Sequence, residues 1–384
     1  MAASDARLLG TRLNLYLGVE RATPAPPELM EALQRVEVEL GDDGNDGFQI
    51  TFGAGRRLGV VSADSPVFEH PLLTPFSRVV VQISIGPTVE SLIDGFITHR
   101  QADPGDEPGS ATLTVTGEDV RVMMDIEERT VNHLGLSPEL RVLTILAQYQ
   151  QYFGLPPRIL PPRNSRVPSP LERIPIQSGT DLAYIRQLAD KHAHVFYVEP
   201  GSKPNTNAAY WGPPPETSEP QPALTVNMGP DSNARIRFSY DSLKPETSDG
   251  AALDSRLRVL MPVIAQLPGG PSLAASSARD FQRGIVRKTL ARRSLGDSII
   301  DVLDSGNAAA ERSNAPLTAS AEVDVGAYGH VLKPRRLVGV RGAGRQLDGI
   351  YYVKRVTHAI RRGSYQQRCT LQREGIGRTV EVLQ

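Results

Sequence analysis

Gly349-Ile-Tyr-Tyr-Val-Lys-Arg-Val-Thr-His358, then Arg361-Arg-Gly-Ser364, then Tyr365-Gln-Gln-Arg-Cys-Thr-Leu-Gln-Arg373 is the stretch that decides the fold. Residues alternate in type along both arms with the period of a β-strand, and a Gly-containing segment separates the arms. The stretch therefore predicts a β-hairpin. One face should lie in a barrel core, and it is expected to carry Val353, Val356, Cys369 and Leu371. Neither arm holds a nucleophile, an acid pair or a metal-ligand set.

Composition favours a β-rich protein with more than one domain. The chain has 384 residues, of which 40% are hydrophobic and 22% charged, and its 31 Pro and 34 Gly indicate many loops. We expect no membrane span and no signal peptide, so the protein should be made soluble in the cytoplasm. The single cysteine, Cys369, excludes an internal disulfide and a cysteine-based zinc cluster. It is expected to be a core thiol.

Charge is unevenly distributed along the chain. Residues 254 to 384 carry 21 Lys and Arg against 11 Asp and Glu, which leaves 21 against 32 for residues 1 to 253. Such asymmetry is typical of a nucleic-acid face or of two complementary docking surfaces. The basic stretch from Arg283 to Arg293 lacks the interleaved aromatic residues of a single-strand binder. We therefore favour subunit docking, and nucleic acid is an unlikely partner.

The predicted fold class is mainly β with α insertions (α+β). In the first part, short strands separated by turn-rich segments suggest a barrel or sandwich; they are expected at 13–19, 35–40, 48–52, 78–85, 91–98 and 111–117. Strands return at 317–325, 334–340, 349–360 and 365–373. This pattern gives three domains: 1–130, a first barrel; 131–253, a helix-containing middle region with Pro-rich linkers; and 254–384, a helical segment and second barrel.

Helices are expected mainly between the barrels. Ser137-Pro138 begins a helix that should run to Phe153 and stop at Gly154, with Leu143, Leu146, Ala147 and Phe153 on its apolar side. Residues 155–175 hold seven prolines and predict an extended linker. A second helix should follow the segment 176–181, and a strand should follow at 194–198. Residues 244–254 are interpreted as a polar break, and a further helix is predicted at 281–304.

Three motifs could carry chemistry, and each has a simpler structural interpretation. His192-Ala-His194 could bind a metal, but no third ligand lies nearby in the sequence. Gly339-Val-Arg-Gly-Ala-Gly344 is expected to be a hairpin turn, because a strand follows it where a phosphate loop needs a helix. The acidic residues Asp125, Glu127 and Glu128 are typical of a solvated face. We predict no enzyme activity, no cofactor and no metal.

Three blocks in this order resemble the phage late control protein D family, the baseplate hubs of contractile tails and of VgrG-type injection spikes. The first is Val79-Val-Val-Gln-Ile-Ser-Ile-Gly86 with Leu92-Ile-Asp-Gly-Phe-Ile97 and Leu113-Thr-Val-Thr-Gly-Glu-Asp119. The second runs from Ile176 through Asp181-Leu-Ala-Tyr-Ile-Arg-Gln-Leu-Ala189 to Phe196-Tyr-Val198. The third is the closing hairpin. Together they span about residues 79 to 373.

The resemblance implies two tube-like β-barrel domains per copy and a homotrimeric ring with pseudo-sixfold symmetry. Such a ring adapts a hexameric inner tube to a trimeric spike. No β-repeat spike follows the hairpin, so the spike is expected to be a separate protein, and other baseplate proteins are expected partners. Four arginines become candidate contacts to a subunit or the tube: Arg355, Arg361, Arg362 and Arg368. Two alternatives stay open, a nucleic-acid-binding β-barrel protein and a tail-associated cell-wall-degrading enzyme.

Overall fold

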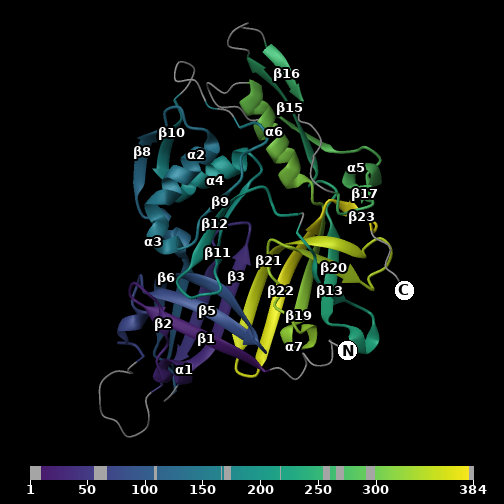
Figure 1. Ribbon diagram of the computed structural model, residues 1–384. Coiled ribbons are helices and arrows are strands. Elements are labelled where there is room, and N and C mark those ends of the chain that lie inside the picture. Colours follow the sequence, from purple (N-terminus) through teal and green to yellow (C-terminus); the bar gives the residue numbers. More distant parts are fainter. Residues whose placement is uncertain are drawn as a thin grey trace.

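The structure is a computed structural model of the 384-residue chain (Figure 1). It describes residues 10–55, 67–107, 110–165, 167, 174–216, 218–253, 260–264, 272–290 and 299–379. Within these ranges the protein is mainly β with inserted helices, as predicted.

A sheet of 13 strands forms the body of the molecule. Its N-terminal strands are β1 (Thr11–Gly18), β2 (Thr23–Pro24), β3 (Leu33–Gly41), β4 (Gly47–Gly53), β5 (Arg78–Ile85), β6 (Thr88–Asp103) and β7 (Thr112–Asp119). Its C-terminal strands are β13 (Gln221–Thr225), β14 (Ala234–Tyr240), β19 (Leu317–Asp324), β20 (Leu337–Arg341), β21 (Gly349–Arg361) and β22 (Ser364–Arg373). The short elements α1 (Pro27–Ala32), η2 (Pro71–Leu73) and α7 (Val325–Tyr328) connect them. Sequence analysis had placed β13 and β14 within the middle region.

The same strand order occurs twice in this sheet. In space the N-terminal strands run β3-β4-β7-β6-β5-β1, and the C-terminal strands run β14-β19-β22-β21-β20-β13. Each set takes its strands in the same chain order, with β1 and β13 first in sequence and last in space. We call these sets the N-terminal repeat and the C-terminal repeat. They differ at one pairing, because β1 lies antiparallel to β5 whereas β13 lies parallel to β20.

Backbone details also recur between the two repeats. β6 has a register shift between Ile97 and His99, and β21 has one between Val353 and Arg355. Ile97 and Val353 each accept a 2.7 Å backbone hydrogen bond, from Phe76 and Arg335. These two donors have φ angles of 61° and 60°, which non-glycine residues seldom adopt. The strands, the bulges and the unusual turns therefore coincide position by position.

The repeats are joined directly, because β21 pairs with β3 in antiparallel register from Arg355↔Gly41 to Arg361↔Arg35. In Figure 1 the yellow strands β21 and β22 accordingly lie between the N-terminal strands on one side and β19, β20 and β13 on the other. One continuous sheet thus connects the two repeats.

The middle region packs beside the N-terminal repeat. It comprises η3 (Val120–Met124), β8 (Glu128–Asn132), α2 (Pro138–Leu146), η4 (Ala147–Tyr149), α3 (Gln150–Phe153), β9 (Arg158–Ile159), β10 (Ile176–Thr180), α4 (Asp181–Lys191), β11 (Val195–Pro200) and β12 (Asn207–Gly212). The short helix η5 (Gly229–Asp231) lies instead between β13 and β14 of the C-terminal repeat. α4 begins as predicted, with the Thr180 hydroxyl accepting from the Ala183 N–H. The helix predicted up to Phe153 is interrupted by η4. Its buried side contains Val142 and Ile145, whereas Leu143 is 45% exposed, so the predicted apolar side was partly wrong.

An insertion lies between β14 and β19 of the C-terminal repeat. It contains β15 (Glu246–Leu253), β16 (Leu260–Ile264), β17 (Ser276–Ser277), α5 (Ala278–Phe281), β18 (Arg287–Leu290) and α6 (Ile299–Ser313), and β17 pairs with β23 (Gly375–Ile376). The predicted polar break at 244–254 is therefore mostly a strand. The helix predicted at 281–304 is wrong over residues 287–290, which pair in parallel with β15, and residues 291–298 lie outside the described ranges.

Each of the three parts has its own apolar core. The N-terminal repeat buries Val36, Ile50, Phe52 and Val115, together with Ile360 and Tyr365 of the C-terminal hairpin. The middle region encloses Trp211 among helix and strand side chains. The C-terminal repeat buries a third cluster around the hairpin. Because the tip of the hairpin enters the N-terminal core, the two repeats share apolar packing as well as hydrogen bonds.

Candidate assembly surface

A polar sheet face runs across the repeats over the eight strands β14-β19-β22-β21-β3-β4-β7-β6. One cross-strand row of this face contains Arg235, Glu322, Arg368, Thr357 and Glu39. Basic and acidic residues alternate along the first part of that row, and such opposite neighbours on antiparallel strands stabilise the pairing. All side chains in the row are exposed or partly exposed. The face therefore presents mixed charge to solvent.

Two ion pairs reinforce this face near the junction of the repeats. Arg355 Nη1 lies 2.6 Å from Glu39 Oε1, and Arg35 Nη2 lies 2.6 Å from Glu37 Oε2. Both are largely solvent-accessible and contribute little stability individually. Only the first pair joins two strands, Arg355 of β21 to Glu39 of β3, and so favours that register, whereas Arg35 and Glu37 both lie on β3.

Each end of the eight-strand path has an unpaired edge. Residues 98–103 of β6 pair with β7 on one side, while no described strand pairs with their other side, because β5 pairs only up to Phe96. β14 pairs with β19 and likewise has no described partner on its other side. Unpaired edges expose backbone N–H and C=O groups that can bind another strand. These edges are the positions at which a second chain could extend the sheet.

Buried charges hold the three parts of the molecule together. Arg335, in the segment before β20, donates from Nη2 to both carboxylate oxygens of Asp46 at 2.7 and 2.9 Å and to the Gly41 carbonyl oxygen at 2.5 Å. The side chains of Arg335 and Asp46 are 6% and 2% exposed. The Arg335 guanidinium also lies over the Tyr197 ring of the middle region, with Cζ 4.3 Å from the ring centroid. One cation thus contacts both repeats and β11.

A second buried arginine extends this network. The guanidinium of Arg121 in η3 donates hydrogen bonds to the Asp119 carboxylate and, at 2.7 Å, to the Phe196 carbonyl oxygen. Its Nη2 atom also lies 3.7 Å from Asp46 Oδ2. Removing such charges from water is costly, so every buried partner is needed to compensate. The network therefore fixes the N-terminal repeat to the C-terminal repeat and to the middle region.

The environment shifts the pKa of several groups in this network. Burial raises the pKa of Asp42 to about 6, although the nearby charge of Arg335 and a hydrogen bond from Tyr352 oppose the shift. Burial acts to lower the pKa of Arg335, but the carboxylates of Asp46 and Asp42 raise it more, so the net shift is upward. Arg335 is accordingly a permanent cation in this site.

A third buried ion pair fastens β5 and β6 to the middle region. The Arg78 guanidinium forms a bidentate contact with Asp94, at 2.7 and 2.9 Å, and also donates to the Tyr152 carbonyl oxygen. Asn207 of β12 donates to the same carboxylate at 3.0 Å. Planar, two-point contacts of this kind specify geometry as well as charge.

The predicted core residues of the hairpin are all buried. Val353, Val356 and Leu371 are 0% exposed, Cys369 is 3% exposed, and all four belong to the C-terminal core. Strict alternation would put Val353 and Val356 on opposite faces. The register shift at Lys354 turns both toward the core.

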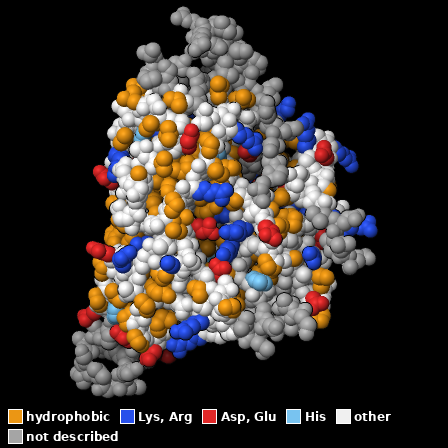
Figure 2. Space-filling model, in the orientation of Figure 1, with side chains coloured by type: hydrophobic (Ala, Val, Ile, Leu, Met, Phe, Trp, Pro, Cys, Tyr) orange, Lys and Arg blue, Asp and Glu red, His pale blue; other side chains and the backbone are white. Residues whose placement is uncertain are grey.

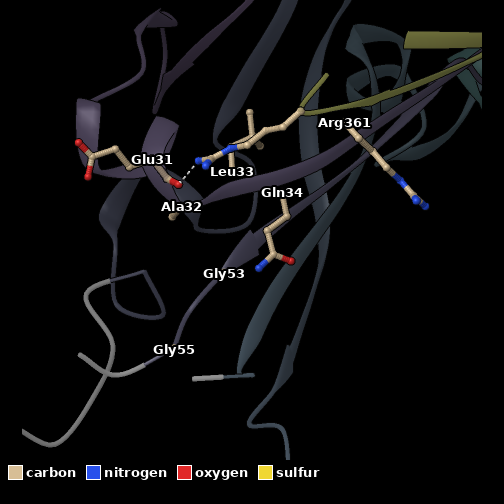
Figure 3. A pocket seen from close by; sticks show the side chains of 8 residues that line it. Glu31, Ala32, Leu33, Gln34, Gly53, Gly55 and Arg361 are labelled. Atoms are coloured by element: carbon tan, nitrogen blue, oxygen red, sulfur yellow. Dashed lines mark hydrogen bonds between the residues drawn. The ribbon is translucent and has the colours of Figure 1, made fainter. Parts of the chain in front are cut away.

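The four predicted contact arginines lie on or beside the polar face. Arg355 is engaged with Glu39, and Arg368 is exposed in the middle of the face. Arg361 and Arg362 are exposed where β21 ends. Both border an open depression lined by α1, β3 and β4 residues, and Arg362 donates to the Glu31 carbonyl oxygen at 2.5 Å. In Figure 3 the Arg361 side chain points away from Glu31.

A smaller cavity lies where the three parts meet. It has a volume of about 200 Å³ and is bordered by Leu40, Tyr197, Arg335 and His358, among others. Burial lowers the pKa of His358 to about 3, so its imidazole is neutral at pH 7. The Nδ1 atom of this ring lies 2.8 Å from the Tyr365 hydroxyl oxygen.

The motifs that suggested other chemistry do not assemble into a site. The His192 and His194 rings lie 6.2 Å apart, and no group of three His, Cys, Asp or Glu within the described ranges is arranged to hold a metal. The segment 339–344 spans the end of β20 and the loop leading to β21, as predicted. Asp125, Glu127 and Glu128 are exposed.

On the face seen in Figure 2 the surface does not show the charge asymmetry of the sequence. On the face in Figure 2, basic and acidic side chains are interspersed, and several gather near the middle of the view. Among the helices of the described segments, none combines the length and apolar character required to cross a membrane.

Comparison with solved structures identifies the fold. A tail protein from Neisseria meningitidis superposes with a TM-score of 0.63 over 96% of this chain and 98% of that chain, at 13% identity. A 43 kDa tail protein of prophage MuSo2 from Shewanella oneidensis has a TM-score of 0.62 at 14% identity and covers 95% and 99% of the two chains. The protein therefore has the fold of phage tail proteins.

A secretion-system protein shares this fold. An Escherichia coli component of the type VI secretion system, described as structurally similar to the T4 tail proteins gp27 and gp5, has a TM-score of 0.53 at 12% identity. The match covers 88% of this chain and 73% of that chain. No family model matches the sequence, and no curated protein matches it.

Sequence analysis missed the buried network and both sheet edges. It assigned no role to Asp42, Asp46 or Arg335. A usable signal was present in the Asp-rich turn 41–47, because a strand-connecting segment with several acids needs partners when it is buried. The edges had no local signal.

Proposed function

We propose that this protein is the structural baseplate hub of a contractile phage tail or phage-tail-like injection particle. Three copies would form a ring of six nearly equal repeats that adapts a hexameric inner tube to a trimeric spike formed by a separate protein. The single observation that carries the proposal is the strand order that occurs twice in one chain. The fold shared with phage tail proteins supports the same role.

The symmetry argument follows from the repeats. A ring of three chains has threefold symmetry, but a chain of two similar halves gives it six similar units. One side can then match a sixfold tube while the differences between the halves still match a threefold spike. Cyclic head-to-tail contacts close such a ring. The buried arginine network would keep the two repeats of each chain at a fixed angle, which closure requires.

Mass measurement of the protein with its cognate spike tests the stoichiometry. We expect three copies for each spike trimer in native mass spectrometry of the co-purified complex. The control is the spike expressed alone. A complex with two or six copies per spike trimer would contradict the proposal.

The middle region is the proposed contact to other baseplate proteins. It exposes Leu134, Leu140, Leu143 and Ile176, which are between 44% and 59% exposed. Side chains of this kind grouped on one part of a surface are typical of protein contacts. Crosslinking of intact particles should place α2 and residues 155–165 against neighbouring proteins. Crosslinks that place this region only within its own chain would contradict this assignment.

The proposed role is architectural and has no catalytic step. Purified protein should therefore leave peptidoglycan turbidity at the buffer baseline, and its affinity for DNA should be weak at physiological salt. Clearing of peptidoglycan would favour the enzyme alternative. Tight DNA binding with a steep salt dependence would favour a nucleic-acid-binding role.

A further inference from the structure

We infer that residues 98–103 of β6 in one copy pair with β14 of the next copy, in a register that sets Asp103 opposite Arg237. This inference rests on the proposed ring and specifies its interface. It starts from the junction inside the chain, where the C-terminal part of β21 pairs with β3. In the repeat equivalence, β6 corresponds to β21 and β14 corresponds to β3. The junction between copies would therefore repeat the junction within a copy.

The strand directions are compatible with this pairing. Every neighbouring pair along the path from β14 to β6 is antiparallel. Because the path has eight strands, β6 runs opposite to β14. Copies related by rotation about a ring axis keep their strand directions, so β6 of one copy would meet β14 of the next in antiparallel orientation. An odd number of strands would have forced parallel pairing at the junction.

The register follows from the equivalent positions. In the N-terminal repeat, Phe96 lies opposite Arg78, the first residue of β5. In the C-terminal repeat, Tyr352 lies opposite Leu337, the first residue of β20, so Phe96 and Tyr352 are equivalent. Because both strands have the bulge at the same place, residues the same distance beyond Phe96 and Tyr352 are equivalent, and Asp103 is therefore equivalent to Ala359. This count uses the pairing of each long strand with its hairpin partner, β7 or β22.

The same procedure assigns β14. Val38 lies opposite Phe48 of β4, and Phe238 lies opposite Ala319 of β19. Phe48 and Ala319 are equivalent, because the residues that they face on β7 and β22 are equivalent in turn. Glu37 is thereby equivalent to Arg237. Since Ala359 faces Glu37 at the internal junction, Asp103 should face Arg237 between copies.

The residues brought together by this register are chemically complementary. Asp103 and Arg237 have opposite charge, both are exposed, and neither has an ion-pair partner among the described residues. Asp103 Oδ1 accepts from the Gly105 N–H at 3.0 Å, which leaves Oδ2 for the guanidinium. The same register places Gln101 opposite Ser239, both polar and exposed. No like charges meet at any of these positions.

Cysteine crosslinking tests the register directly. Oxidation of Gln101→Cys/Ser239→Cys should give covalent trimers as the largest closed species, because directly opposite residues lie within disulfide distance. The control is Gln101→Cys/Arg235→Cys, in which the second cysteine is displaced four residues, roughly 13 Å, along β14. The native Cys369 is buried and should not contribute. Equal crosslinking of both pairs, or of neither, would overturn the inference.

Charge reversal gives a second measurement. Asp103→Arg should weaken each junction about fivefold and, over three junctions, reduce ring yield more than tenfold at a fixed protein concentration. Adding Arg237→Asp should restore the yield. Rings unaffected by the single reversal would contradict the register while leaving the trimer intact. A stoichiometry other than three would instead contradict the proposed function.

Discussion

Removing the Asp46 carboxylate should strongly destabilise the protein, because that group neutralises a cation buried between three parts of the fold. Asp46 receives two hydrogen bonds from Arg335 and one from the Gly41 N–H at 2.9 Å, and it is 2% exposed. In Asp46→Ala the guanidinium would stay buried, with Asp42 as its nearest remaining carboxylate at 3.4 Å. Arg121 would also lose a counter-charge.

The magnitude follows from the energetics of unpaired buried charge. Deleting one partner of a buried ion pair costs about 3 to 5 kcal/mol, far more than the pair itself contributes. Arg335→Ala should also destabilise the fold. The double variant should cost less than the sum of the two by at least about 1 kcal/mol, because the second change removes the charge that the first left unpaired.

Urea unfolding is the appropriate assay, since an ionic denaturant would screen the charges. Fluorescence of Trp211, which is buried in the middle region, reports that part of the fold, and far-ultraviolet circular dichroism reports the sheet. Asp43→Ala is the matched control. Its carboxylate is 60% exposed beside Lys354, so its loss should change stability by less than about 0.5 kcal/mol. The reasoning would be refuted if Asp46→Ala and Asp43→Ala lost similar stability. It would also be refuted if the double variant Asp46→Ala/Arg335→Ala lost as much stability as the two single variants together.

Three further outcomes are expected. Leu371→Ala should cost about 2 to 5 kcal/mol in thermal unfolding, whereas Arg368→Ala should leave the melting temperature nearly unchanged and act only on assembly; equal losses would show that the hairpin faces are misassigned. Gly95→Ala should cost about 1 to 3 kcal/mol, because a Cβ there would lie 2.0 Å from the Glu118 carbonyl oxygen, and an unchanged midpoint would exclude that close approach. Asp42 has a folded pKa of about 6, above its ordinary 3.8. Its contribution to the free energy of unfolding is therefore fully present below pH 3.8, where the carboxyl is protonated, and is lost as pH rises through 6. Asp42→Asn should therefore gain on the order of 2 to 3 kcal/mol over the wild type between pH 4 and 7, and a constant difference would contradict the shift.

Local patterns predicted the elements that local chemistry determines. The hairpin followed from alternation and turn composition, and α4 from the capping segment 176–181, in which the structure identifies Thr180 as the capping residue. Prediction failed where tertiary packing overrides periodicity. Leu143 has the spacing of a core residue in one continuous helix to Phe153, but α2 ends at Leu146 and buries Val142 and Ile145, which leaves Leu143 on its exposed side. Strand β18 was predicted as a helix, although it forms by pairing with a strand about 40 residues earlier.

The assembly surface could not be predicted from the sequence. The junction pairs residues 35–41 with residues 355–361, and no local pattern specifies a partner so distant in the chain. The buried cations were equally hidden, because arginines and aspartates in turns are usually solvated. The repeat itself was not detectable from identities. Phe76 and Arg335 share a backbone conformation and a hydrogen bond but differ in residue type, while Arg35 and Arg235 happen to share their residue type.

The differences between the repeats bear on how many chains a ring would contain. If both repeats had identical edges, a strand β6 could bind β3 of another copy as readily as β14, and rings of several sizes would compete. β3 is already occupied by β21 of its own chain, and at equivalent places it carries Glu37 where β14 carries Arg237. Asp103 would therefore be repelled by the position on β3 and attracted by the one on β14. Discrimination of this kind needs an unfavourable alternative as well as a favourable contact. On the proposed register, divergence between the repeats would make them alternate around the ring, so that the geometry of six units is closed by three chains.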